Sequence, residues 1–144
     1  MRTRYFALIM GIGFLAVGIL GFVPRLLTAP EGQPSLMIEA GHGNLFGLFP
    51  VNVLLNLVHL IFGIWGVVVW RAFAASRVYS RSVAIIYGVL TIMGLIPGLH
   101  TVFGLVPLHG NDIWLHAIIA IAAGYFGYAS VPAVESSGPV VRRP

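Results

Sequence analysis

The segment GLFPVNVLLNLVHL, residues 47–60, is apolar enough to enter a membrane, yet it carries Asn52, Asn56 and His59. These polar residues follow one another at intervals of four and three, which places them on one face of a helix. The segment GLVPLHGNDIWLH, residues 104–116, repeats the pattern: both contain Gly-Leu-x-Pro with a histidine nine residues after the proline. The sequence therefore predicts two similar apolar helices, each with a histidine at the same place.

The composition is that of an integral membrane protein. Hydrophobic residues make up 58% of the 144 residues and charged residues only 8%, whereas a soluble domain has about 25% charged residues. The mean hydropathy is +0.96. We therefore expect the lipid bilayer to be the principal partner of this chain.

The charged residues and the lack of cysteine exclude several classes of function. The positive charge comes from eight arginines, with no lysine, and these lie at the chain ends and in predicted loops rather than in one patch. Nucleic acid is therefore not expected as a partner. Because there is no cysteine, disulfides, thiolate catalysis and iron–sulfur sites are excluded, and any metal must be bound by His, Asp, Glu or Asn.

Four uncharged runs predict four membrane-spanning helices, since a span needs about 20 apolar residues. We expect them at about 5–24, 48–70, 82–97 and 112–131. The third run meets Pro97-Gly98, so its helix either ends there or kinks and continues toward Phe103. The predicted fold is all-α: one transmembrane domain, residues 1–134, followed by a disordered cytoplasmic tail at 135–144.

The arginines predict the orientation. Seven of the eight lie at the ends of predicted helices that share one side: Arg2, Arg4, Arg71, Arg77, Arg81, Arg142 and Arg143. The positive-inside rule makes that side cytoplasmic. We therefore expect a multi-pass protein of the bacterial cytoplasmic (inner) membrane with both termini in the cytoplasm.

The repeat extends to the first and third predicted helices. RYFALIMG, residues 4–11, matches RSVAIIYG, residues 81–88, through Arg, Ala, Ile and Gly at equal places. The bundle would then consist of two tandem helical-hairpin repeats, related by a pseudo-two-fold axis along the membrane normal. Coincidental similarity between membrane helices is the alternative interpretation.

Polar residues of the second and fourth predicted helices form a seam that we expect in the outer half of the bundle interior. In a bilayer, polar side chains need protein partners, and small residues allow helices to approach closely. The second helix has a stripe of Asn52, Asn56, His59, Gly63 and Gly66, and the fourth has His109, Asp112, His116, Ala120, Ala123 and Gly127. The predicted polar seam is Asn52, Asn56, His59, Asp112 and His116.

His59 and His116 have three interpretations. They can hydrogen-bond to neighbouring helices and stabilise the bundle. They can bind a cofactor, either haem iron or a metal, between the two halves. They can also transfer protons or solutes, since ionisable groups inside a membrane are often functional.

All five histidines are predicted to lie in the outer loops or in the outer halves of the helices. His42 and His109, together with Asp112, are candidate ligands for a divalent transition metal. No HxxxH or HxH pair occurs in the sequence, so such a site would depend on contacts between separate segments.

The segments GLFPVNVLLNLVHLIFG and VPLHGNDIWLH resemble the two characteristic blocks of a bacterial family of small four-helix membrane proteins, known as domain of unknown function 4383. The resemblance covers most of the chain and implies an integral membrane location with four spans. It implies no activity and no functional residues. Members of that family often have a histidine at the place of Leu55, which would pair with His59, and this chain lacks it.

The sequence thus favours a non-enzymatic membrane or accessory module of unknown biochemical activity. The alternative is a haem- or metal-binding redox protein, or a small proton- or solute-handling protein, that uses His59 and His116. A homo-oligomer or a larger membrane complex is compatible with either interpretation.

Overall fold

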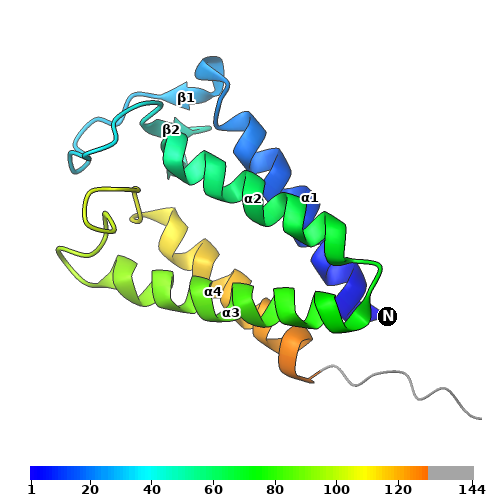
Figure 1. Cartoon of the computed structure of the whole chain (residues 1–144). Helices are drawn as coiled ribbons and strands as arrows, with labels where there is room; N and C mark the ends of the chain where they lie inside the picture. Colours follow the sequence, from blue (N-terminus) through cyan, green and yellow to red (C-terminus); the bar gives the residue numbers. More distant parts are fainter. Residues whose placement is uncertain (130–144) are drawn as a thin grey trace, which may run out of the picture.

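The computed structural model describes residues 1–129, and this part of the chain is mostly helical (Figure 1). Its helices are α1 (Arg2–Leu20), α2 (Val53–Val69), α3 (Phe73–Leu95) and α4 (Asn111–Gly124), which continues as the π-helical turn η2 (Tyr125–Ala129). Within these residues, α1, α3 and α4 with η2 are long and apolar enough to cross a membrane. The apolar helix α2 is shorter, at 17 residues.

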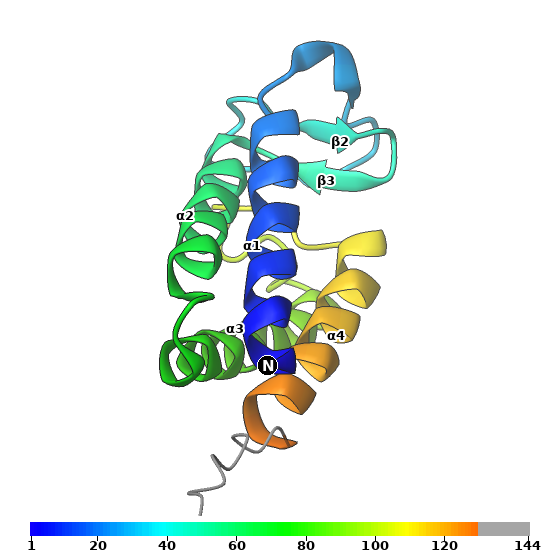
Figure 2. The same ribbon diagram turned by 90° about the vertical axis from the view of Figure 1, so that its right-hand side faces the viewer.

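The helices form two hairpins, α1 with α2 and α3 with α4 (Figure 1). The hairpins meet where the chain begins and where η2 ends, and they diverge toward the loops at the other end. Seen from the side, α1 lies between α2 and α4 (Figure 2). The pairing of consecutive helices is the one expected from the sequence.

Glycines allow α1 and α2 to touch along their backbones. A Cβ added to Gly11 would lie 2.7 Å from the Val67 backbone nitrogen and 2.9 Å from the Gly63 carbonyl oxygen. A Cβ on Gly66 would lie 2.7 Å from the Ala7 carbonyl oxygen. Close approach of this kind needs residues without side chains at the crossing. The predicted small-residue stripe of α2 therefore faces α1.

The third helix was predicted at 82–97, and this was wrong at its start, because α3 begins at Phe73. The basic segment before residue 82 is helical and partly buried. The Ser76 hydroxyl donates to the Val69 carbonyl at 2.9 Å. The guanidinium groups of Arg77 and Arg81 both donate to the Gly127 carbonyl, at 3.0 and 2.9 Å. These contacts with the end of α2 and with η2 stabilise a segment whose charge suggested a loop.

The other end of α3 follows a local rule. The residue before a proline is disfavoured in the helical region, and Ile96, before Pro97, is extended with φ −96° and ψ 116°. Of the two alternatives for this segment, the helix therefore ends here and does not continue toward Phe103.

The prediction of an all-α chain also needs correction, because the first long loop contains a small antiparallel sheet. Its strands are β1 (Leu27–Thr28), β2 (Gly43–Leu45) and β3 (Phe49–Val51), in the order β1-β2-β3. The short 3-10 helix η1 (Pro24–Leu26) leads into it. Asn44 pairs with Pro50 in the register of β2 and β3.

This loop changes two predicted boundaries. The first helix ends at Leu20 instead of residue 24, where a turn and Pro24 of η1 follow. The second begins at Val53 instead of residue 48, because residues 49–51 pair as a strand and Asn52 caps the helix.

The fourth helix begins at Asn111 and becomes π-helical at Tyr125. The predicted tail at 135–144 lies outside the described residues.

The main core lies where the hairpins meet. Its buried side chains come from α1, α3 and α4, and they are Phe6, Ala7, Phe14, Tyr79, Val83, Tyr87 and Ala123. A second cluster of Leu45, Val51 and Leu55 fixes the sheet onto the start of α2. The first cluster joins the two hairpins at one end, whereas the buried residues of the second all belong to the first hairpin and its loop.

Candidate functional site

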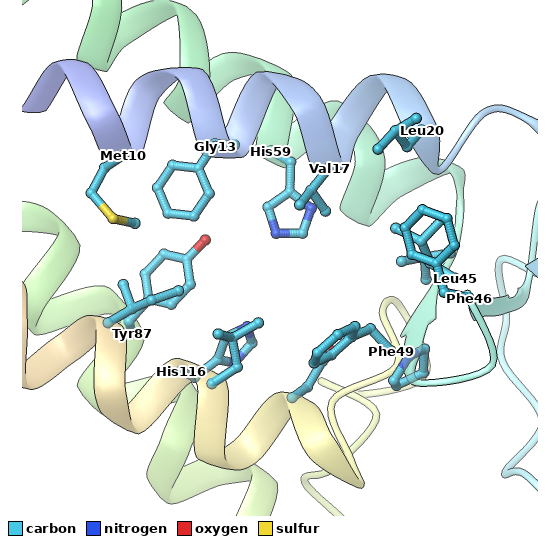
Figure 3. A pocket seen from close by; sticks show the side chains of 16 residues that line it. Met10, Gly13, Val17, Leu20, Leu45, Phe46, Phe49, His59, Tyr87 and His116 are labelled. Carbon is cyan, nitrogen blue, oxygen red and sulfur yellow. The ribbon is translucent and has the colours of Figure 1, made fainter. Parts of the chain in front are cut away.

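A cavity of about 340 Å³ lies between the diverging hairpins (Figure 3). Its walls are α1, the β2–β3 region and α4, with one residue each from α2 and α3. The walls are almost wholly apolar and include Met10, Val17, Leu45, Phe49, Leu115 and Ile119.

Four polar side chains line this cavity. They are His59 on α2, Tyr87 on α3, and Asp112 and His116 on α4. His59 and His116 extend into it from opposite sides, and the Tyr87 hydroxyl points into the space between them (Figure 3). His59 is 8% exposed and His116 only 3%. The two histidines singled out by the repeat thus share one site.

Aromatic contacts connect these histidines along one wall. The His59 ring stacks on Phe14 with centroids 5.7 Å apart. Phe14 stacks on Tyr87 at 5.4 Å, and Tyr87 meets the His116 ring edge to face at 4.8 Å. Offset stacks and edge-to-face contacts are favourable arrangements for such rings. The imidazoles are therefore held in place mainly by aromatic packing.

Both imidazoles keep unused hydrogen-bonding capacity. Within residues 1–129, Nδ1 of His59 and Nδ1 of His116 are buried without a hydrogen-bond partner. A neutral imidazole has one donor and one acceptor nitrogen, and a buried polar atom without a partner is costly. The interpretation in which these histidines stabilise the bundle by hydrogen bonds therefore lacks those bonds at Nδ1. These two nitrogens are enclosed by protein atoms, so a molecule in the cavity would contact the rest of each ring.

The remaining residues of the predicted seam have other roles. The Asn52 side chain is fully buried and donates to the carbonyls of Ile38 and Leu105, at 2.9 and 2.8 Å. It does not line the cavity. The Asn56 side chain is buried beside Gly21, and neither of its polar atoms has a partner within the described residues. Of the five predicted seam residues, only His59, Asp112 and His116 meet at the cavity.

The family model described as "Domain of unknown function (DUF4383)" matches residues 4–129. The chain belongs to this family. No curated protein and no solved structure matches it. The resemblance noted in the sequence is thereby confirmed, and since the family description states no activity, the function of this DUF4383 chain has to be inferred from the cavity.

The predicted metal ligands of this DUF4383 chain are His42, His109 and Asp112. Within residues 1–129, no group of three His, Asp or Glu side chains is placed to hold a metal ion. Asp112 lines the cavity. His42, in the first loop, contacts the Gln33 amide oxygen through Nε2 at 3.2 Å. His109 faces His100, with ring centroids 6.4 Å apart.

The two loop histidines favour their neutral forms. Burial lowers the pKa of His109, and the nearby His100 and His42 lower it further. Burial also lowers the pKa of His42, although Glu39 partly offsets this effect. Charging either imidazole would bring positive charge into a partly desolvated loop.

Sequence reasoning missed the aromatic wall and the loop residues of the cavity. Phe14 and Tyr87 are apolar or aromatic residues in apolar helices, so hydrophobic periodicity does not distinguish them from their neighbours. The repeat did contain a signal for Tyr87. In the alignment of residues 4–11 with 81–88, Met10 matches Tyr87, and both line the cavity.

Proposed function

We propose that this DUF4383 chain is a multi-pass protein of the bacterial cytoplasmic membrane, with four spans and a cytoplasmic N terminus. Three long apolar helices support this, and the 17 residues of α2 extend about 25 Å at 1.5 Å per residue, the lower limit for a span. At the arginine-rich end, Arg4 donates to the Trp70 carbonyl at 3.0 Å. Tryptophan beside arginine is typical of the membrane–water interface.

The lack of cysteine allows a clean test of this orientation, because an introduced thiol has no background. Glu31 lies in an exposed turn of the first loop, and Ala72 is exposed between α2 and α3. In intact cells, a membrane-impermeant maleimide should label Glu31→Cys and should label Ala72→Cys only after lysis. The opposite pattern would mean that the orientation is reversed. Equal labelling of both positions would contradict the four-span proposal.

The function that the geometry supports best is the non-enzymatic binding of a lipid-soluble small molecule between the hairpins. The observation that carries this proposal is an apolar cavity of about 340 Å³ that is lined by two buried imidazoles, those of His59 and His116. Small-molecule sites typically occupy about 300–1,000 Å³ and combine apolar walls with a few polar groups. Such a module captures or carries its ligand without chemical change.

We infer that the cavity opens between α1 and α4, because lining residues of both helices are exposed. Gly13 on α1 and Leu115 on α4 both line it, and both are exposed. In a four-span arrangement these helix faces contact lipid, so the opening would face the acyl chains. A ligand dissolved in the bilayer could then enter sideways without crossing water.

The two-hairpin repeat supports the same site. The pairs His59 with His116 and Met10 with Tyr87 occupy equivalent places in the repeat, and all four residues line the cavity. An ancestral hairpin that duplicated would place its pocket-lining residues around the pseudo-two-fold axis in this way.

Replacing Gly13 by phenylalanine should close the opening without disturbing the fold. A Cβ at Gly13 meets nothing within 4 Å, and the same holds for Gly88 on α3, which does not line the cavity. Gly88→Phe is therefore a matched control. Solvent extraction and mass spectrometry of the purified proteins should reveal a lipophilic compound enriched over bulk lipid in wild type and Gly88→Phe, and lost from Gly13→Phe. Equal amounts in all three proteins would contradict the proposal.

The haem- or metal-binding alternative is the second candidate, favoured by two imidazoles that enter one cavity from opposite sides (Figure 3). The same wild-type preparation tests it. A Soret band or a stoichiometric metal that disappears in His59→Ala and His116→Ala would establish this alternative in place of the first. The proton- or solute-handling alternative has less support, because the cavity walls are almost wholly apolar.

A further inference from the structure

The polar groups of the cavity indicate which polar atoms a ligand needs. His59 comes from the first hairpin and His116 from the second, and they face the same space from opposite sides (Figure 3). Each is more than nine-tenths buried and lines the cavity. A ligand with one polar atom at each end of an apolar body would meet both imidazoles.

The charge of the lining residues indicates an uncharged ligand. None of the described residues that line the cavity is arginine or lysine, and Asp112 adds a carboxyl group. Phosphate and carboxylate headgroups are bound through cationic side chains in proteins. A phospholipid headgroup or a fatty acid carboxylate would therefore find no counter-charge here.

The aromatic wall indicates a planar ligand. Phe14 and Tyr87 stack with an interplanar angle of 21°, and His59 continues the stack with an angle of 26° to Phe14. A flat ring gains favourable offset or edge-to-face contacts with such a surface. The opening at Gly13 and Leu115 leaves an exit for an apolar tail toward lipid.

From these features we propose that the cavity binds a lipid-soluble quinone or quinol, with one ring oxygen hydrogen-bonded to His59 and the other to His116. This inference rests on the proposed function and names its ligand class. A quinone presents two carbonyl acceptors on opposite sides of a flat uncharged ring, and its quinol presents two hydroxyls. A neutral imidazole can donate to the first or accept from the second, so both oxidation states can bind.

The test uses the full-length protein in lipid nanodiscs and two matched probes. The first is a 1,4-naphthoquinone with a short isoprenoid tail, and the second is the naphthalene with the same tail and no oxygens. Binding is measured by equilibrium dialysis against empty nanodiscs. The quinone should bind saturably at one per chain and at least about tenfold more tightly than the hydrocarbon, a difference of about 1.4 kcal/mol.

Variants connect this binding to the imidazoles. His59→Leu and His116→Leu should each weaken quinone binding about tenfold, as the loss of one buried hydrogen bond would, and should leave hydrocarbon binding unchanged. His42→Leu, which alters a histidine outside the cavity, is the control. Gly13→Phe should abolish the binding of both probes.

The outcomes separate the two proposals. Equal affinity for the two probes, or quinone binding that neither cavity histidine affects, would overturn the quinone assignment and leave a general apolar site. If neither probe binds saturably, and extracts of wild type and Gly13→Phe are identical, the proposed function itself fails. If the histidine variants do not fold, the ratio of the two probe affinities in wild type still tests the quinone assignment.

Discussion

Replacing Gly11 by valine is expected to force α1 away from α2 and to lower the free energy of unfolding by about 3 kcal/mol. A Cβ at this position would lie within 2.7 to 2.9 Å of three backbone atoms of α2, in Gly63, Gly66 and Val67. Backbone atoms inside a helix cannot rotate away, so the whole helix must move. Thermal unfolding in detergent, followed by circular dichroism, measures the loss.

Gly13→Val is the matched control for this change. It makes the same substitution two positions along the same helix, so both variants carry the same cost of β-branching in a helix. Its Cβ meets nothing within 4 Å, and the variant should unfold close to the wild-type temperature. Equal unfolding temperatures for the two variants would mean that α1 and α2 do not cross at these glycines.

This helix crossing also positions the site. Gly63 and Gly66 lie on the same face of α2 as His59 and hold it against α1, and His59 then stacks on Phe14 of α1. A wider crossing would separate these rings and would remove the wall on which a planar ligand stacks. Gly11→Val should therefore weaken ligand binding as well as the fold.

The polar face of α2 could be predicted because it contrasts with its surroundings. Asn56, His59, Gly63 and Gly66 recur at helical spacing within an apolar segment, and all four are buried. The repeat then linked His59 to His116, and both line one cavity. Periodicity works when the residues of one face differ chemically from those of the other.

The start of α3 could not be predicted because it depends on tertiary contacts. Residues 71–81 carry three arginines and two serines, which in isolation resemble a loop between helices. The carbonyl of Gly127, which accepts from both Arg77 and Arg81, lies about 50 residues away along the chain. The sheet that closes one end of the cavity could not be predicted for a different reason, because strands of two or three residues are too short to show alternation.

Asn52→Ala is the second change with a large expected effect, because this one side chain joins three segments. Its amide donates to Ile38 in the first loop and to Leu105 in the second, at 2.9 and 2.8 Å. Its oxygen accepts from the Leu55 backbone N–H at 2.9 Å and caps α2. Losing the cap costs about 0.5–2 kcal/mol, and each carbonyl left without a partner adds about 1 kcal/mol or more. We expect a total loss of about 3 kcal/mol or more in detergent unfolding experiments.

Two further variants separate the contributions of Asn52. Asn111→Ala removes an exposed amide that makes one bond between segments, to the Leu48 carbonyl at 3.1 Å, and should change stability by no more than about 0.5 kcal/mol. Asn52→Asp keeps the capping oxygen but has no N–H to donate, and it turns a carboxylate toward the two carbonyls. If Asn52 served only as a helix cap, aspartate would be tolerated. A loss as large as that of alanine would establish instead that Asn52 connects the two hairpins across the end where they diverge, and so sets the width of the cavity.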